Sequence, residues 1–100
     1  MLKEINIMEI PSYKLFINGN YVESSTGNKI PVLNPANNEV IAYVAEASNE
    51  DVDKAIEAAK KAFKEWSKTD PTRRGRILYK IASLLRDKSE ELAKLETLNN

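Results

Sequence analysis

The side chains that enzymes use most often for nucleophilic and acid–base chemistry are missing from this sequence. Its 100 residues include no cysteine and no histidine. A cysteine nucleophile, a histidine general base, a disulfide and a thiolate or imidazole metal site are therefore excluded within it. Any chemistry would have to come from carboxylates, hydroxyls, amines and guanidinium groups.

The sequence Arg73-Arg74-Gly75-Arg76 is the charge cluster that most invites a functional interpretation. Arginines act as forked hydrogen-bond donors to phosphate and nucleic acid. However, 15 basic residues balance 15 acidic ones, so no global field attracts nucleic acid or anionic lipid. We therefore favour a solvated first turn of a helix, with one arginine paired to an acid elsewhere, and expect no nucleic-acid partner.

Two acidic pairs, Glu50-Asp51 and Glu90-Glu91, are candidates for paired catalytic carboxylates. Both lie at predicted helix beginnings, where acidic side chains cap the helix and favour its positive end. Phe63 and Trp66 are candidates for a pocket lining, but they share a helical stripe with other apolar residues, which favours core packing. From the residues alone we assign no catalytic and no cofactor-binding residue.

The elements that would position these residues change type near residue 47. Residues 13–46 hold runs of β-branched and aromatic residues, and Asn18-Gly19 suits a two-residue hairpin turn because both positions need positive φ. Gly27 marks a second turn. We expect a small antiparallel sheet of unknown strand order, preceded by a leader at residues 1–12.

Helices are predicted at about 49–66, 71–87 and 89–98. Ser48 and Asp51 match a capping box at the first, and Asp70-Pro71 gives the second an N-cap and a proline at its first position. We expect a break near 87–89, with Ser89 as a fresh N-cap; one long kinked helix is the alternative.

These elements predict an α+β chain, in which a small antiparallel β-hairpin or sheet is followed by two or three amphipathic helices. The content of 30% charged residues favours a soluble protein. The N-terminus lacks the apolar core of a secretory signal, and no stretch is long enough to cross a bilayer. We expect a cytoplasmic protein with no membrane partner.

Four segments in order, "NGNYVES", "VLNPANNEVI", "EDVDKAIEAAKKAF" and "LETLNN", closely resemble the N-terminal segment of the NAD(P)-dependent aldehyde dehydrogenases. The resemblance covers about residues 14–100. It implies that residues 13–100 are the N-terminal part of the family's α/β cofactor-binding domain. It also implies that the whole enzyme is an oxidoreductase, which converts an aldehyde to a carboxylic acid with NAD(P)+ through a cysteine thioester.

In that family the helix matching "ELAKLETLNN" leads into a Gly-Lys pair, and the nucleophilic cysteine, the general-base glutamate and the oxyanion-hole asparagine lie further on. The resemblance therefore implies a fragment that is inactive alone and holds no NAD or NADP. Its partners would be the remainder of the chain and further subunits of a homo-oligomer. The alternative is a stand-alone, non-enzymatic interaction module that self-associates or binds a separately encoded remainder.

The resemblance also implies one ion site. Many family members bind a monovalent cation through backbone carbonyls just before an Asn-Pro pair. Here these carbonyls belong to Val32 and Leu33, which precede Asn34-Pro35. A third ligand would come from beyond Asn100, so we expect no ordered ion in the isolated chain.

Overall fold

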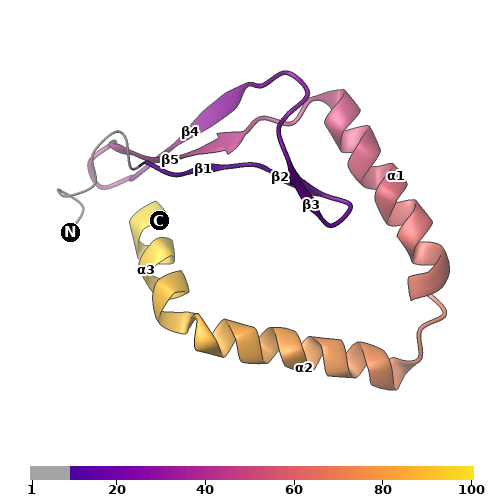
Figure 1. Ribbon diagram of the computed structural model, residues 1–100. Helices are drawn as coiled ribbons and strands as arrows, with labels where there is room; N and C mark the ends of the chain where they lie inside the picture. Colours follow the sequence, from indigo (N-terminus) through magenta and orange to yellow (C-terminus); the bar gives the residue numbers. More distant parts are fainter. Residues whose placement is uncertain (1–9) are drawn as a thin grey trace.

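A computed structural model describes residues 10–100 of the chain (Figure 1). Five short strands precede three helices, in the order β1 (Ser12–Tyr13), β2 (Leu15–Ile17), β3 (Asn20–Val22), β4 (Lys29–Leu33), β5 (Val40–Ala45), α1 (Asn49–Trp66), α2 (Pro71–Asp87) and α3 (Ser89–Asn99). Most of the predicted leader, residues 1–9, lies outside the described residues. Ser12, its last residue, belongs to β1.

The strands form two sheets, whereas the sequence predicted one small antiparallel sheet. Strands β1, β5 and β4 pair in that order, with β1 parallel to β5 and β4 antiparallel to it. Strands β2 and β3 form a separate antiparallel hairpin. The chain leaves the first sheet at Lys14 and begins the hairpin at Leu15, which is why one run of extended residues contributes to two sheets.

The turns follow the predicted chemistry. Asn18 and Gly19 both have positive φ, 54° and 79°, as a tight two-residue hairpin turn requires. Gly27, in the next turn, has φ 75°. Asn38, with φ 60°, closes the β4–β5 connection, and the Asn34 side chain accepts the Ala36 N–H there at 3.0 Å.

The three helices coincide with the predicted ranges to within one residue. Ser48 and Asp51 form the predicted capping box, and Asp70 accepts the Arg73 N–H at 3.0 Å as the N-cap of α2. The chain does break after α2, but Ser89 is not the cap. Lys88 occupies the junction, and α3 begins at Ser89 with no side-chain cap hydrogen bond. The break between α2 and α3 therefore comes from the backbone conformation of Lys88, which has φ −105° and ψ 12°.

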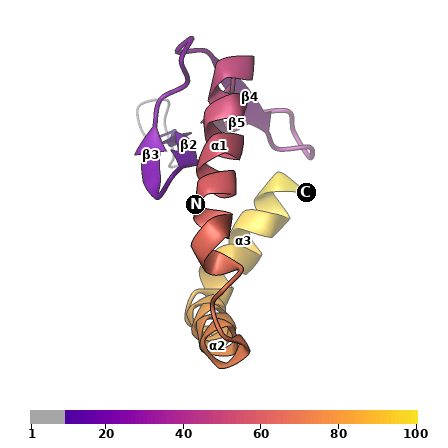
Figure 2. The ribbon, with the colours of Figure 1, turned by 90° about the vertical axis from the view of Figure 1, so that its right-hand side faces the viewer.

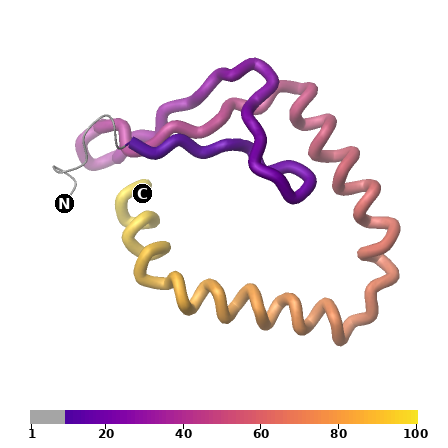
Figure 3. Tube along the Cα trace, viewed as in Figure 1, coloured from indigo at the N-terminus to yellow at the C-terminus, as the bar shows by residue number. Residues whose placement is uncertain are grey.

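The helices form an arc that leaves the sheets and returns toward them (Figures 1 and 3). The view in Figure 2 shows α1 beside the β2–β3 hairpin and α2 at the far end of the molecule. Among residues 10–100 the buried apolar side chain is Ala42, 9% exposed, and none of the large side chains is fully buried. No helix in this part of the chain is both long and apolar enough to cross a bilayer.

Candidate functional site

A hydrogen-bonded polar cluster lies where the β3–β4 loop meets the beginning of α1. The Asp51 carboxylate is buried and accepts the Ser48 N–H at 2.9 Å, while the Ser48 hydroxyl accepts the Asp51 N–H at 3.1 Å. Asp51 also accepts the backbone N–H and the hydroxyl of Ser25. The cluster therefore joins the β3–β4 loop to α1 across more than twenty positions of sequence.

Hydrogen bonds to the Asp51 carboxylate favour its ionised form. The Ser48 amide, followed by the Ser25 amide, holds the pKa of Asp51 below its ordinary value of 3.8 because both donate to the charged form. Burial works in the opposite direction and is the weaker effect. An acid held ionised in this way makes a good helix cap and a poor proton donor, so the cluster is structural.

The arginine cluster stays a solvated helix turn. Arg73 and Arg76 are exposed, and Arg74 is half-buried. Within residues 10–100, the ion pairs involve lysines, so the expected pairing of one arginine with an acid is not found there. Gly75 lies inside α2, where its backbone N–H belongs to the helix and cannot cradle a phosphate.

The two acidic pairs are separated in the fold and do not converge on a site. Asp51 belongs to the capping box, and Glu50 pairs with Lys54 at 3.3 Å along the same helix. Glu90 pairs in the same way with Lys94 at 3.7 Å in α3. Glu50 and Glu90 therefore each form an i,i+4 pair within their own helix, as such pairs commonly do.

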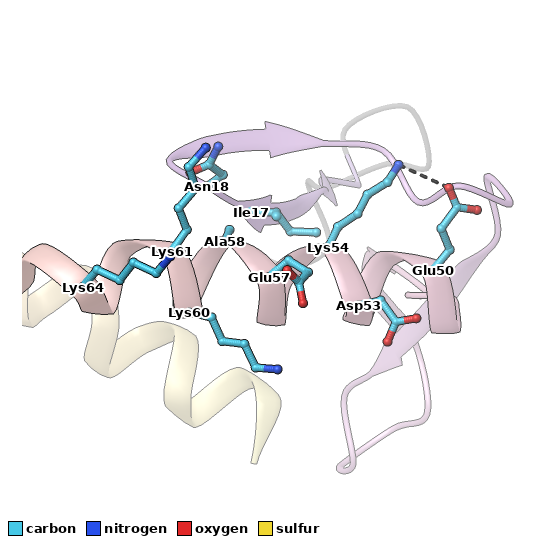
Figure 4. A pocket seen from close by; sticks show the side chains of 10 residues that line it. All are labelled: Ile17, Asn18, Glu50, Asp53, Lys54, Glu57, Ala58, Lys60, Lys61 and Lys64. Atoms are coloured by element: carbon cyan, nitrogen blue, oxygen red, sulfur yellow. Dashed lines mark ion pairs between the residues drawn. The ribbon is translucent and has the colours of Figure 1, made fainter.

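A shallow hollow of about 890 Å³ lies between the β2–β3 hairpin and α1 (Figure 4). Its lining mixes four lysines with three acids and two residues of the hairpin: Ile17, Asn18, Glu50, Asp53, Lys54, Glu57, Ala58, Lys60, Lys61 and Lys64. The lysine side chains point in different directions instead of converging on one point. The hollow therefore gathers charges of both signs that do not converge on one point.

The two predicted cation-binding carbonyls lie at an irregularity of the sheet. The β4–β5 register shifts between Val32 and Leu33, where Val32 pairs with Ala42 and Leu33 pairs with Val40. The residue without a partner there is Ile41 of β5, while Val32 and Leu33 each keep a partner in the register. Backbone carbonyl oxygens are hard ligands, of the kind that hard cations accept. The residues present thus fit a cation by donor type.

The end of α3 approaches this same corner. A hollow of about 460 Å³ is lined by two residues next to the predicted ion site and by one face of α3: Asn34, Ala36, Ala93, Lys94, Thr97 and Leu98. Asn34 itself is buried. The fold therefore places the C-terminal turns of α3 beside the β4–β5 connection, although sixty positions separate them in sequence.

Sequence reasoning was wrong about two aromatic residues and missed one polar residue. Phe63 and Trp66 were expected to pack in a core, but they are 64% and 45% exposed. Ser25 precedes the turn at Gly27 and was given no role from the sequence, whereas its N–H holds Asp51 in place. A serine has no periodic pattern that would indicate such a contact, so no signal in the sequence pointed to it.

Comparison with known proteins gives a consistent result. The sequence profile of the aldehyde dehydrogenase family matches residues 21–100. Malonate-semialdehyde dehydrogenase 1 of Geobacillus thermodenitrificans is 50% identical over 91 residues, which are 91% of this chain and 19% of the relative. The mitochondrial aldehyde dehydrogenase family 2 member B4 of Arabidopsis thaliana is 44% identical over 95 residues, which are 93% and 18% of the two chains.

Solved structures agree with the sequence comparison. The NAD+ complex of an aldehyde dehydrogenase from Bacillus cereus superimposes with a TM-score of 0.85 at 41% identity, over 89% of this chain and 18% of that one. A 3,6-anhydro-L-galactose dehydrogenase superimposes with a TM-score of 0.84 at 34% identity, over 88% and 18%. The chain spans about a fifth of the length of these proteins. Sequence and fold together show that this chain belongs to the aldehyde dehydrogenase family.

Proposed function

We propose that residues 13–100 form the N-terminal part of the cofactor-binding domain of an NAD(P)-dependent aldehyde dehydrogenase. The whole enzyme would oxidise an aldehyde to a carboxylic acid in the cytoplasm, as a homo-oligomer. The chain described here would supply a scaffold of two small sheets and three helices. It would supply no catalytic residue and no residue that contacts NAD or NADP.

One observation carries this proposal. The chain superimposes on an NAD+-bound aldehyde dehydrogenase with a TM-score of 0.85 over 89% of its length. A match in sequence and in fold along nearly the whole chain supports a shared structural role. A fold alone would not imply a function, but the 41% identity links the chain to this one family.

We further propose that the carbonyl oxygens of Val32 and Leu33 take part in a monovalent cation site. The β4–β5 bulge at these two residues and the adjacent hollow beside α3 support this role. A bound cation, coordinated by these carbonyl oxygens, would stabilise β4 at the point where its register against β5 shifts. Further ligands would have to come from outside these two residues.

The scaffold role is tested by replacing the matching N-terminal segment of the Bacillus cereus enzyme with this chain. We expect the chimera to fold, to assemble like the parent and to reduce NAD+ in the presence of an aldehyde, which absorbance at the NADH band would follow. The parent enzyme is the positive control. A parent from which the segment has been deleted is the negative control, and it should be inactive.

The isolated chain separates this role from a stand-alone interaction module. With NAD+ or NADP+ and a panel of aldehydes, we expect no reduced cofactor to form. If the chimera failed to fold while the isolated chain formed a discrete, well-ordered assembly, the interaction-module alternative would replace the scaffold role.

A further inference from the structure

The tip of the β2–β3 hairpin carries the single Asn-Gly sequence of the chain, Asn18-Gly19. Both residues are exposed. Among residues 10–100 the Asn18 side-chain amide has no hydrogen-bond partner, and the Asn20 side chain donates to the main-chain oxygen of Asn18 instead, at 3.3 Å. A Cβ added to Gly19 would meet no atom within 4 Å. The Asn18 amide is therefore free to turn, and the space around the next peptide nitrogen is open.

This pair of residues can react without an enzyme. The Gly19 nitrogen loses its proton and forms a bond with the side-chain carbonyl carbon of Asn18, and the side-chain nitrogen leaves as ammonia. Water then opens the resulting succinimide ring at one of its two C–N bonds. The products are aspartate, or isoaspartate in which the main chain runs through the former side-chain CH2. Water is the only co-reactant, and glycine favours the attack because it has no side chain to hinder it.

The closed turn works against the reaction. Ring closure requires rotation about the bond between the Cα and the carbonyl carbon of Asn18, and the pairing of Ile17 with Asn20 holds the turn closed. However, the hairpin pairs only three residues on each strand and forms a sheet separate from β1, β5 and β4. Two-stranded hairpins of this kind are marginally stable, and such segments open locally before the rest of a protein unfolds. The reactive conformation is therefore reached by opening the hairpin.

We propose that Asn18 is a site of spontaneous deamidation, and that opening of the β2–β3 hairpin controls its rate. The modification converts a neutral amide to a carboxylate at an exposed turn. This inference does not rest on the proposed function, because it uses only residues of the hairpin and of α1.

The reaction would change how the hairpin meets α1. An isoaspartate adds a CH2 group to the main chain of the turn, so the two-residue connection that aligns Ile17 with Asn20 is lost. The hairpin tip also faces the alanine residues of α1 across a cavity of about 310 Å³. Loss of the turn would therefore loosen the cover of this helix face.

The new carboxylate would enter a surface that already holds charges. Asn18 lines the hollow beside α1 together with Lys61. In Figure 4 the Lys61 side chain extends from α1 toward the turn, whereas Glu50 and Asp53 lie toward the other end of the hollow. A negative charge at position 18 would therefore be attracted to α1 at the same time as the turn is disrupted.

The site is tested on the 100-residue chain, incubated in neutral buffer and digested for peptide mass spectrometry. Deamidation appears as the gain in mass when an amide NH2 becomes OH, and labelling by a protein-isoaspartate methyltransferase identifies isoaspartate. Asn28 is the internal reference, because it is exposed in a nearby turn but precedes a lysine. We expect Asn18 to react at least about ten-fold faster than Asn28, a difference in barrier of about 1.4 kcal/mol. Equal rates at the two residues would overturn the site.

Control by the hairpin is tested at a distance from the reacting peptide. Tyr21 pairs with Phe16 across the hairpin, with 4.9 Å between ring centroids, and such aromatic pairs stabilise by ≈ 0.5–1.5 kcal/mol. Tyr21→Ala should therefore open the hairpin more often and speed deamidation about two- to ten-fold. Tyr79→Ala, at an exposed position of α2, is the matched control and should leave the rate unchanged. A Tyr21→Ala rate equal to that of the control would overturn control by the hairpin.

Gly19→Ala separates the chemistry from the loosening of the turn. It strains the same hairpin, because φ is 79° at this position, but its methyl group also hinders the attacking nitrogen. We expect Gly19→Ala to deamidate more slowly than the unsubstituted chain, although Tyr21→Ala deamidates faster. A faster reaction in both variants would contradict the role given to the glycine.

Discussion

Both carboxylate oxygens of Asp51 accept the backbone N–H of Ser25, at 3.2 and 3.1 Å. The two residues are 26 positions apart, so the contact fixes the β3–β4 loop against the beginning of α1. The chain has little apolar core, and this polar contact is therefore a main determinant of how its β-rich half meets its first helix. The same carboxylate also caps that helix, so one side chain carries two structural roles.

Replacing Asp51 with alanine should release the loop and fray the first turn of α1. The variant loses the capping box and both contacts with Ser25 in a single step. Amide hydrogen exchange measured by NMR should show lost protection at Ser25 and Ser48. Asp53→Ala is the matched control, because Asp53 is exposed and lies outside the capping box. Equal protection in the two variants would contradict the role given to Asp51.

The Asp51 cluster should also respond to acid. Because the folded-state pKa of Asp51 lies below its ordinary value of 3.8, its ionised form contributes stability that is present in full above that value. The contribution is lost as the pH falls below 3.8 and through the folded-state pKa. A carbon-detected NMR titration should give a midpoint below 3.8 for this carboxyl group. In Asp51→Asn, the loosening of the Ser25 loop should no longer depend on pH in this range.

Local signals were sufficient to predict most of the secondary structure. The Asn18-Gly19 turn, the Ser48–Asp51 capping box and the Asp70-Pro71 helix start each depend on residues that are close in sequence. All the residues that each motif needs lie within four positions of sequence. Its local conformation is therefore decided by neighbouring residues and not by tertiary contacts. The same locality explains why the helix limits were predicted to within one residue.

Long-range relationships were less accessible from the sequence. The parallel pairing of Ser12–Tyr13 with β5 depends on two strands separated by about thirty residues, and two residues carry too little pattern to predict a partner. The exposure of Phe63 has a different cause. Helical periodicity identifies an apolar face but not whether anything covers it. A pattern of this kind cannot distinguish a core from a docking surface.

Two glycines offer a matched pair of alanine substitutions with opposite outcomes. An added Cβ meets no atom within 4 Å at Gly19 or Gly75, so only the backbone conformation decides. Gly19→Ala should destabilise the hairpin by about 1–2 kcal/mol because φ is 79° there. Gly75→Ala should stabilise α2 by up to about 1 kcal/mol. Cross-strand nuclear Overhauser effects would measure the stability of the hairpin, and circular dichroism would measure the stability of α2. If both substitutions stabilised, or both destabilised, their elements, this account would be contradicted.

The proposed cation site predicts a dependence of stability on the type of salt. The chimera should melt at a higher temperature in potassium or sodium chloride than in choline chloride of equal ionic strength, because only the small cations reach carbonyl oxygens at the Val32–Leu33 bulge. Leu33→Pro is a local probe, since the ring removes a backbone N–H and restricts the residue before it. It should reduce the difference between salts. An equal melting temperature in all three salts would argue against the site.

The exposed aliphatic faces predict how the isolated chain behaves when no partner is present. Burial of one aliphatic side chain contributes roughly 1.5–3 kcal/mol to stability. The free energy that would be gained by burying the exposed aliphatic side chains of α2 and α3 is therefore comparable to the ~5–15 kcal/mol stability of a whole domain. These side chains include Leu78, Ile81, Leu85, Leu92 and Leu95. We therefore expect the chain to self-associate at micromolar concentration, and sedimentation velocity would detect species larger than 11.3 kDa. A combined Ile81→Asp and Leu85→Asp variant should shift the chain toward monomer, whereas Tyr79→Asp should not. A wild-type chain that stays monomeric and melts in one cooperative transition would mean that these faces find cover within the chain, and the need for a partner would disappear.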